Sequence, residues 1–341
     1  MNCSGDLEAV GETLERNYAG YAHATKTLGK RLDVAMSAAR RAAVGSERAD
    51  CDGAIRSFLK IFEDGHLLLT SSFSPPVDMP PPLFQGMRDP LARALSGSAF
   101  LIRVPSFAVG FKPDLDALLE AHRGAIKKRE ILIVDVRGNT GGGDSTWTDL
   151  IAPIYTDPMT RWGILWRPTE DNARAIEEQI EPLRKSAQVS SAVCDAMQLV
   201  ADGMRENLDQ NLAKLGPQLA PLVTLPEVWS TPRRVAIIVD GSCGSSCENF
   251  LLAARQSAKV TVFGESTYGA IDFQNVRIAS LPSGNRQLRF AMSMSLRVLA
   301  IEERQRGLSP DHQLPPEVLR DPDAAIEHVL RELKVKSDGA P

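Results

Sequence analysis

The sequence predicts an α/β protein with a helical unit at its N-terminus. After residue 100, short apolar runs alternate with segments whose apolar residues recur at helical spacing. Two of these runs, residues 131–135 and 235–239, are almost wholly apolar, which is typical of strands buried on both faces of a parallel sheet. Each run leads into a turn of small residues, and this order of elements indicates an α/β layer.

Residues 1–95 are expected to form the helical unit. Apolar residues recur there at spacings of three and four, as in two or three helices: Leu7, Val10 and Leu14, then Ile55, Leu59 and Phe62. Prolines at residues 75–76 and 80–82 fit neither a regular helix nor a central strand, so they mark a boundary.

Residues 96–335 are expected to form the α/β core. Strands are predicted over residues 101–104, 131–135, 235–239 and 260–263, and helices around Leu115, Trp147 and Leu251. Residues 170–222 show only helical periodicity, which predicts a helical insertion that we interpret as a lid. Apolar residues alternate from Leu288 to Met294, which predicts a half-exposed strand.

The composition excludes several classes of function. The chain of 341 residues has a net charge of −4 and no basic run, which argues against nucleic acid as a partner. No apolar stretch is long enough to span a bilayer. The first residues lack the basic and apolar regions of a signal peptide, which leaves a cytoplasmic protein or a mature segment whose signal was removed.

The five cysteines match no zinc-binding pattern, so neither a metal nor another cofactor is expected. We expect Cys243 and Cys247 to be small packing residues. Cys3 and Cys51 are candidates for a disulfide between N-terminal helices, provided that the compartment is oxidising.

The turn after the second apolar run carries the candidate nucleophile, Ser245. Gly244 permits a sharp turn, and the helix that follows would direct its positive end at developing negative charge. The backbone N–H of Ser246 is an expected oxyanion donor, with Gly141 or Gly142 of the first turn as the second. Ser246 is the alternative nucleophile. On the turn alone, a helix cap is the favoured role of these serines.

A nucleophilic serine needs a base, and His66 is the candidate. It lies between a predicted helix end at Gly65 and a short strand. The structural alternative is a histidine that caps the helix or is solvated. In the first turn, Arg137 and Asn139 are candidates for contacting the substrate, with a structural partner as the alternative for Arg137. Asp135 is expected to hold the turn through backbone N–H groups. We expect Asp135 and Arg137 to lie on opposite faces and not to pair directly.

Four blocks in this order resemble the carboxyl-terminal processing (tail-specific) peptidases. Residues 135–142 resemble the family's D-x-R-x-N-x-G-G signature, and residues 244–248 its nucleophile segment, in which Ser precedes an acidic residue by three. Residues 264–269 are similar to G-x-x-T-x-G, and residues 307–311 to G-[IV]-x-P-D. The resemblance covers the chain from about Phe100 to Leu314.

By this resemblance the core would be the β-spiral fold related to ClpP and crotonase, and no stretch resembles a PDZ domain. Ala270 stands where members with a Ser–Lys dyad have Lys, so the resemblance points to the tricorn-like branch, which also includes retinoid-binding repeats. That branch uses a His from an Asp-Gly-His segment, which corresponds to His66, and a Glu that orients it, for which Glu302 and Glu303 are candidates. Gly65 stands where tricorn has Ser.

Together these features predict a serine peptidase that hydrolyses peptide bonds of a peptide or unfolded-protein substrate. A non-catalytic protein of the same fold, holding a peptide or an apolar ligand, is the alternative. The resemblance favours an extracytoplasmic location, periplasmic or secreted, with the signal removed from this sequence, while a cytoplasmic location stays open. The sequence does not indicate the oligomeric state.

Overall fold

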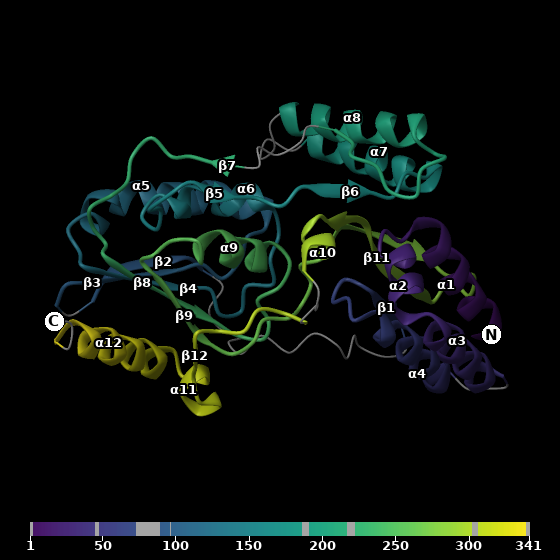
Figure 1. Ribbon diagram of the computed structural model, residues 1–341, viewed down its shortest axis with the longest axis horizontal. Coiled ribbons are helices and arrows are strands. Elements are labelled where there is room, and N and C mark those ends of the chain that lie inside the picture. The colour runs from purple at the N-terminus through teal and green to yellow at the C-terminus, as the bar shows by residue number, and fades with distance from the viewer. Residues whose placement is uncertain are drawn as a thin grey trace. The chain divides into compact units, whose positions relative to one another are not determined.

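The computed structural model describes residues 3–44, 48–72, 89–95, 97–185, 191–216, 222–301 and 306–338. Its backbone contacts divide the chain into two compact units (Figure 1). Unit 1 comprises Met1–Met79, Trp162–Leu219 and Asp272–Arg304, and unit 2 comprises Pro80–Arg161, Ala220–Ile271 and Gln305–Pro341. Within the described residues, no helix is long and apolar enough to cross a membrane.

Unit 1 combines a helical N-terminal region with an antiparallel sheet. Its helices are α1 (Cys3–Asn17), α2 (Tyr21–Leu28), α3 (Lys30–Ala43), α4 (Arg48–Leu59), the 3₁₀ turn η1 (Lys60–Phe62), α7 (Glu170–Lys185), α8 (Ser191–Glu206) and α10 (Arg297–Ala300). Its strands are β1 (Leu68–Ser71), β6 (Ile164–Trp166), β10 (Phe273–Ser280) and β11 (Arg286–Ser295). The sheet has the order β1-β11-β10, with β6 also paired to β11.

The boundaries of this unit differ from those expected. Four helices, α1 to α4, precede β1 in the described residues, where two or three were predicted. The hairpin β10–β11 and the predicted insertion, α7 and α8, belong to the same unit as the N-terminal helices and not to the unit of the parallel sheet. Local periodicity does not reveal such long-range pairing, because β1 pairs with β11 across more than 200 residues.

The strand β11 is more buried than predicted. One face of this strand was expected to be exposed, yet residues 290–295 are all buried. As the central strand, β11 has residues in two apolar clusters, one with α1 to α4 and one with α7 and α8. The buried Arg286 of β11 binds Asp6 of α1 at 3.0 Å and Asp52 of α4 at 2.5 Å.

The predicted Cys3–Cys51 disulfide is present and joins α1 to α4. The two cysteines are 48 residues apart in the sequence. By the chain-entropy relation, a bond that closes a loop of that length stabilises a fold by about 4 kcal/mol.

Unit 2 is an α/β layer. Its strands are β2 (Leu91–Ala94), β3 (Ala99–Arg103), β4 (Ile131–Asp135), β5 (Met159–Thr160), β7 (Leu222–Val223), β8 (Arg234–Val239), β9 (Val260–Gly264) and β12 (His312–Gln313). Its helices are η2 (Val109–Phe111), α5 (Lys112–Ile126), α6 (Asp144–Trp147), η3 (Thr148–Ile151), α9 (Ser246–Ala254), α11 (Pro316–Arg320) and α12 (Pro322–Asp338). The main sheet has the order β12-β9-β8-β4-β3-β2 and is parallel except for β2.

Both faces of this sheet are covered, which explains the continuous apolar runs. Leu132, Val134 and Ile237 pack on the side of α5, α6 and α9, whereas Ile133 and Ile238 pack on the side of α11 and α12 (Figure 1). The predicted strands at 131–135 and 235–239 are therefore confirmed. Because β4 and β8 are adjacent and parallel, their carboxyl ends, which carry the two small-residue turns, lie at the same edge of the sheet.

Candidate active site

The turn between β8 and α9 holds Ser245 in a strained conformation. Its φ is 56° and its ψ is −120°, and it is one of three non-glycine residues with positive φ in the described part of the chain. A side chain in this region costs about 1–3 kcal/mol, so the surrounding structure must impose it. A sharp strand-to-helix turn that presents a partly exposed serine is the geometry of a nucleophile elbow.

The glycine turn after β4 packs directly against this elbow. A Cβ atom on Gly141 would lie 2.4 Å from the carbonyl oxygen of Gly244 and 3.0 Å from the nitrogen of Ser246. Gly141 also has a φ of +95°, so both its conformation and its surroundings require glycine. The structure thus brings together the two turns that the sequence singles out.

The hydrogen bonds of the glycine turn distinguish the two candidate oxyanion donors. The N–H of Gly141 donates to Oδ1 of Asn139 at 2.9 Å, so it is already used. Within the described residues, the N–H of Gly142 has no acceptor, and neither has that of Ser246 at the start of α9. Gly142 and Ser246 are therefore the residues whose N–H groups are available to a bound group.

The hydroxyl of Ser246 is committed to a buried polar cluster. Its Oγ donates to Oδ1 of Asp144 at 2.6 Å and accepts from Nε1 of Trp147 at 3.0 Å. Nδ2 of Asn249 donates to the same carboxylate at 3.1 Å. These bonds fasten α9 to α6, and the 2 % exposure of Ser246 leaves its hydroxyl poorly accessible. The geometry does not favour Ser246 as an alternative nucleophile.

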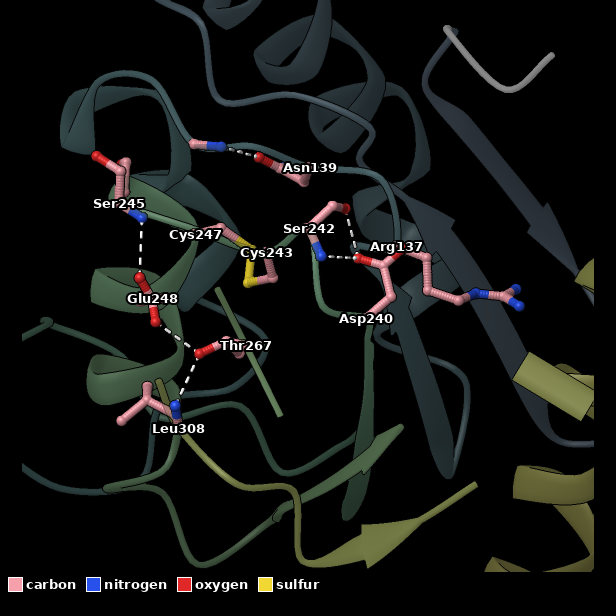
Figure 2. Close-up of a disulfide and its surroundings, with 12 residues drawn as sticks. Arg137, Asn139, Asp240, Ser242, Cys243, Ser245, Cys247, Glu248, Thr267 and Leu308 are labelled. Carbon is pink, nitrogen blue, oxygen red and sulfur yellow. Dashed lines mark hydrogen bonds between the residues drawn. A yellow bond between two sulfur atoms is a disulfide. The ribbon is translucent and has the colours of Figure 1, made fainter. Parts of the chain in front are cut away.

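The carboxylate of Glu248 fixes the Ser245 turn through hydrogen bonds. Its Oε2 accepts the N–H groups of Ser245 at 3.0 Å and Ala270 at 2.7 Å, and its Oε1 accepts the Thr267 hydroxyl at 2.6 Å and the Gly269 N–H at 2.9 Å. Figure 2 shows the Ser245 side chain pointing away from this carboxylate. Burial raises the pKa of the Glu248 carboxyl, and these four bonds act in the opposite direction.

The sequence block at residues 307–311 joins the same network. The Thr267 hydroxyl accepts the N–H of Leu308 at 2.7 Å (Figure 2). Thr267 therefore links the three later sequence blocks, since it bonds to Glu248 of the first and to Leu308 of the last.

Asp135 and Arg137 do pair directly, contrary to expectation. Nε and Nη2 of Arg137 each donate to the Asp135 carboxylate at 2.8 Å. The expectation was wrong because residues two apart in an extended segment lie on the same face. Nη1 of Arg137 donates to the carbonyls of Leu319 at 2.7 Å and Asp321 at 3.2 Å, and Nη2 donates to that of Pro322 at 3.2 Å. Arg137 is buried and ties β4 to α11 and α12, so it is not placed to contact a substrate.

Asn139 is also structural. Its side chain is fully buried, with Nδ2 donating to the carbonyl of Val104 at 3.0 Å and Oδ1 accepting the N–H of Gly141. It shapes the glycine turn and has no surface to offer a substrate, which corrects the second substrate-contact prediction. The prediction that Asp135 holds backbone N–H groups is confirmed, since Oδ1 accepts the N–H of Arg137 at 3.2 Å.

The remaining predicted catalytic residue, His66, belongs to unit 1. Its Nδ1 lies 2.6 Å from the carbonyl oxygen of Phe273. A carbonyl only accepts, so Nδ1 carries the proton and Nε2 has the free lone pair, as a base requires. Burial lowers the pKa of the imidazole to about 4, aided by the charge of Arg289 and opposed by the bond to Phe273. The ring is therefore neutral at pH 7.

Two further residues of unit 1 support His66. The backbone N–H of His66 donates to Oδ1 of Asp64 at 2.8 Å, and the Tyr18 hydroxyl donates to Oδ2 at 2.9 Å. The Tyr18 ring also packs against Phe273, with 5.4 Å between centroids. Tyr18 thus contacts both residues that hold His66. Glu302 and Glu303, the candidates for an orienting acid, lie outside the described residues.

Cys243 and Cys247 form a disulfide, so the prediction that they are simple packing residues was wrong (Figure 2). Both are fully buried in the apolar cluster of unit 2, and the bond spans the Ser245 turn. Their separation of four residues is too short to suggest a disulfide framework by spacing alone.

Several site residues were not identified from the sequence. They share a supporting role: Tyr18, Asp64 and Phe273 around His66, and Asp144, Trp147 and Asn249 around Ser246. Only Asp64 carried a signal, as part of the Asp-Gly-His segment. The others lie far from their partners in the sequence, where no local pattern marks them.

Solved structures with the same fold extend over nearly the whole chain. A structure from Parabacteroides merdae, provisionally described as a peptidase, is 16% identical with a TM-score of 0.64 and covers 100% of this chain and 99% of its own. Mature CPAF complexed with lactacystin is 13% identical with a TM-score of 0.65, covering 98% and 97%. A lipoprotein from Streptococcus agalactiae is 13% identical with a TM-score of 0.51, covering 98% and 97%.

At these identities the likeness shows the fold alone. A comparison with curated proteins finds no match to the sequence. The sequence model of peptidase family S41, however, matches residues 99–314, more than half of the chain. The matched range includes both turns and the Glu248 network. The chain belongs to peptidase family S41.

Proposed function

We propose that the protein is a serine peptidase in which Ser245 is the nucleophile and His66 the general base. The observation that carries the proposal is the strained elbow, which presents a partly exposed hydroxyl beside two unused backbone N–H groups. Strain of this kind persists where function requires it. Family membership supports peptide bonds as the substrate.

In the proposed reaction, Oγ of Ser245 attacks the substrate carbonyl carbon while Nε2 of His66 takes the hydroxyl proton. The N–H groups of Ser246 and Gly142 stabilise the tetrahedral oxyanion, at about 3 kcal/mol for each donor. The imidazolium then protonates the leaving amine, and the peptide bond breaks to give an acyl-enzyme. Water attacks this ester with His66 again as base, which releases the acid and restores Ser245.

The choice of base is supported by two features. Ala270, in the position of the dyad lysine, has a buried methyl group and donates its N–H to Glu248, so it offers no amine. His66 has the neutral tautomer with Nε2 free. The proposal therefore places this chain in the tricorn-like branch without a Ser–Lys dyad. Two disulfides support an oxidising, extracytoplasmic compartment.

A non-catalytic binding protein is the second candidate, and one observation favours it. His66 is oriented by a neutral carbonyl, which stabilises an imidazolium less than a carboxylate would. Such a base is weaker than that of a Ser-His-Asp triad. In this case the elbow would be retained as a fold element, and the site would hold a peptide without cleaving it.

Covalent labelling separates the two candidates. The protein and its Ser245→Ala and Ser246→Ala variants are treated with a fluorophosphonate, the labelled residue is mapped, and hydrolysis of an unstructured peptide is measured. The peptidase proposal predicts labelling at Ser245, abolished only in Ser245→Ala, together with peptide turnover. A folded parent protein that neither labels nor cleaves would support the binding function. Labelling at Ser246 would contradict the assignment of the nucleophile.

A further inference from the structure

We propose that the Cys243–Cys247 disulfide positions Ser245 for attack, so that the peptidase activity depends on the oxidation of this pair. The inference rests on the proposed function. The two cysteines flank Ser245 symmetrically, two residues before it and two residues after it. The bond thus encloses the strained residue itself.

The bond connects the loop after β8 to the first turn of α9. Cys243 belongs to the loop after β8, where its N–H donates to the carbonyl of Asp240 at 3.0 Å and its carbonyl accepts the N–H of Tyr268 at 2.9 Å. Cys247 lies in the first turn of α9. Through the disulfide the helix is covalently fixed to the loop that follows β8 (Figure 2).

The other restraints on the elbow act mainly on its backbone N–H and carbonyl groups. Glu248 accepts the N–H of Ser245, and the carbonyl of Ser245 accepts the N–H groups of Glu248 and Asn249 at 2.9 and 3.1 Å. These bonds fix the two ends of the residue, but hydrogen bonds tolerate rotation of a peptide group. A conformation with positive φ relaxes unless several restraints act together. Among these restraints, the disulfide is the covalent restraint on the turn.

The position of the bond also argues for this role. The Cys3–Cys51 bond closes a loop of 48 residues and constrains the unfolded chain strongly, whereas Cys243–Cys247 closes one of only four. Both Cys243 and Cys247 are fully buried, so the bond lies within the core directly beneath the turn. Its effect is therefore concentrated on local geometry.

Two double variants separate positioning from folding. Cys243→Ala/Cys247→Ala removes the bond under the elbow, and Cys3→Ala/Cys51→Ala is the matched control that removes a disulfide elsewhere. For each we would measure the rate of fluorophosphonate labelling, kcat and KM on a peptide, and the thermal midpoint. We expect the first variant to lower the labelling rate and kcat about 10-fold with KM within about twofold, because small displacements of a reacting group are costly. The control should keep kcat and lower the midpoint more.

Reduction provides a second test that needs no mutation. A dithiol such as dithiothreitol passes two electrons and two protons to the disulfide, giving two cysteine thiols and a cyclic disulfide of the reagent. The same loss of kcat is expected in the parent and in Cys3→Ala/Cys51→Ala, but not in Cys243→Ala/Cys247→Ala. The inference is overturned if the elbow variant labels at the parent's rate, or if reduction leaves kcat unchanged once both thiols are detected. A parent that never labels overturns the proposed function instead.

Discussion

The Ser245 elbow in unit 2 and the His66 segment in unit 1 are built in contrasting ways. At the elbow, Glu248 alone accepts four donors, and two of them, Thr267 and Gly269, belong to another sequence block. Around His66, Asp64 of the same segment accepts the backbone N–H and is itself bonded by Tyr18, while the ring is bonded to a backbone carbonyl 207 residues away. The elbow is specified by short motifs, whereas the position of His66 also depends on tertiary packing.

This difference predicts how each region responds to change. At the elbow, an added side-chain atom would clash with backbone atoms, and a disulfide limits how far the turn can shift. The effect of a substitution there should therefore be large and local. A substitution around His66 removes one of several contacts that hold this segment, so its effect should be graded. The following predictions test that contrast, beginning with the largest effect.

Removing the base itself should cost the most. We expect His66→Ala to lower kcat about 10⁴-fold, because loss of a member of a nucleophile–base pair leaves only oxyanion and binding contributions. His328, which lies on α12, provides a matched control, and His328→Ala should retain parental kcat. Steady-state peptide hydrolysis by the two variants measures the difference. Equal rates for His66→Ala and the parent would show that another group accepts the proton.

Two glycines of the first turn test the packing of the elbow. A Cβ on Gly141 meets the Gly244 carbonyl at 2.4 Å, whereas a Cβ on Gly138, at a φ of +79°, meets no atom within 4 Å. We expect Gly138→Ala to cost about 1–2 kcal/mol of stability from its backbone conformation alone. Gly141→Ala should cost more and lower kcat about 100-fold by displacing the elbow. Chemical denaturation and kcat measurements would decide, and equal effects would count against close packing of the two turns.

The support of His66 should give a smaller effect. Tyr18→Phe keeps the ring against Phe273 but removes the hydroxyl that donates to Asp64. We expect a loss of about 1–3 kcal/mol of stability, since Asp64 keeps its bond to the backbone of His66 but loses a buried donor. The corresponding fall in kcat should be only several-fold. Tyr21→Phe, on the neighbouring helix α2, is the control, and an equal loss there would remove any special role of Tyr18.

Changes of pH within the neutral range should have the smallest effect on kcat/KM. Because the pKa of His66 is lowered to about 4, the base is neutral between pH 6 and 8, and kcat/KM should be flat there. It should fall only as the pH approaches 4. A profile that instead falls with a midpoint near 6.5 would show that the imidazole is solvated in the active form.

The same pKa shift makes a prediction about stability. The unfolded chain binds a proton at His66 near pH 6.5, but the folded chain does so only near pH 4. As the pH falls through this window the unfolded state binds more protons, so stability falls with it. The loss should be absent in His66→Gln. Denaturation midpoints of both proteins between pH 4 and 7 would measure it.

Sequence patterns predicted most of unit 2 because its strands and turns are local. The apolar runs at 131–135 and 235–239 and the positions of Gly141 and Ser245 all follow from segments shorter than ten residues. The unit boundaries were not predictable in this way, since β1 pairs with β11 and no short stretch of sequence contains both strands.

The errors within the site have a physical cause in each instance. Arg137 and Asn139 were predicted to contact substrate because polar residues in a turn are usually exposed, but their hydrogen bonds to Asp135, Val104 and Gly141 bury them. Cys243 and Cys247 were predicted to be packing residues because burial of a cysteine does not reveal its oxidation state. His66 is oriented by a backbone carbonyl, and a sequence carries no signal for such a contact.

The central claim is that His66 acts as the base for Ser245. Its most direct test is a crystal structure of the oxidised protein, from which the distance between Nε2 of His66 and Oγ of Ser245 is read. The account predicts a separation of about 2.6–3.5 Å, with Nδ1 of the same ring still bonded to the Phe273 carbonyl. A separation that no side-chain rotation closes would contradict the claim and leave the elbow without its base.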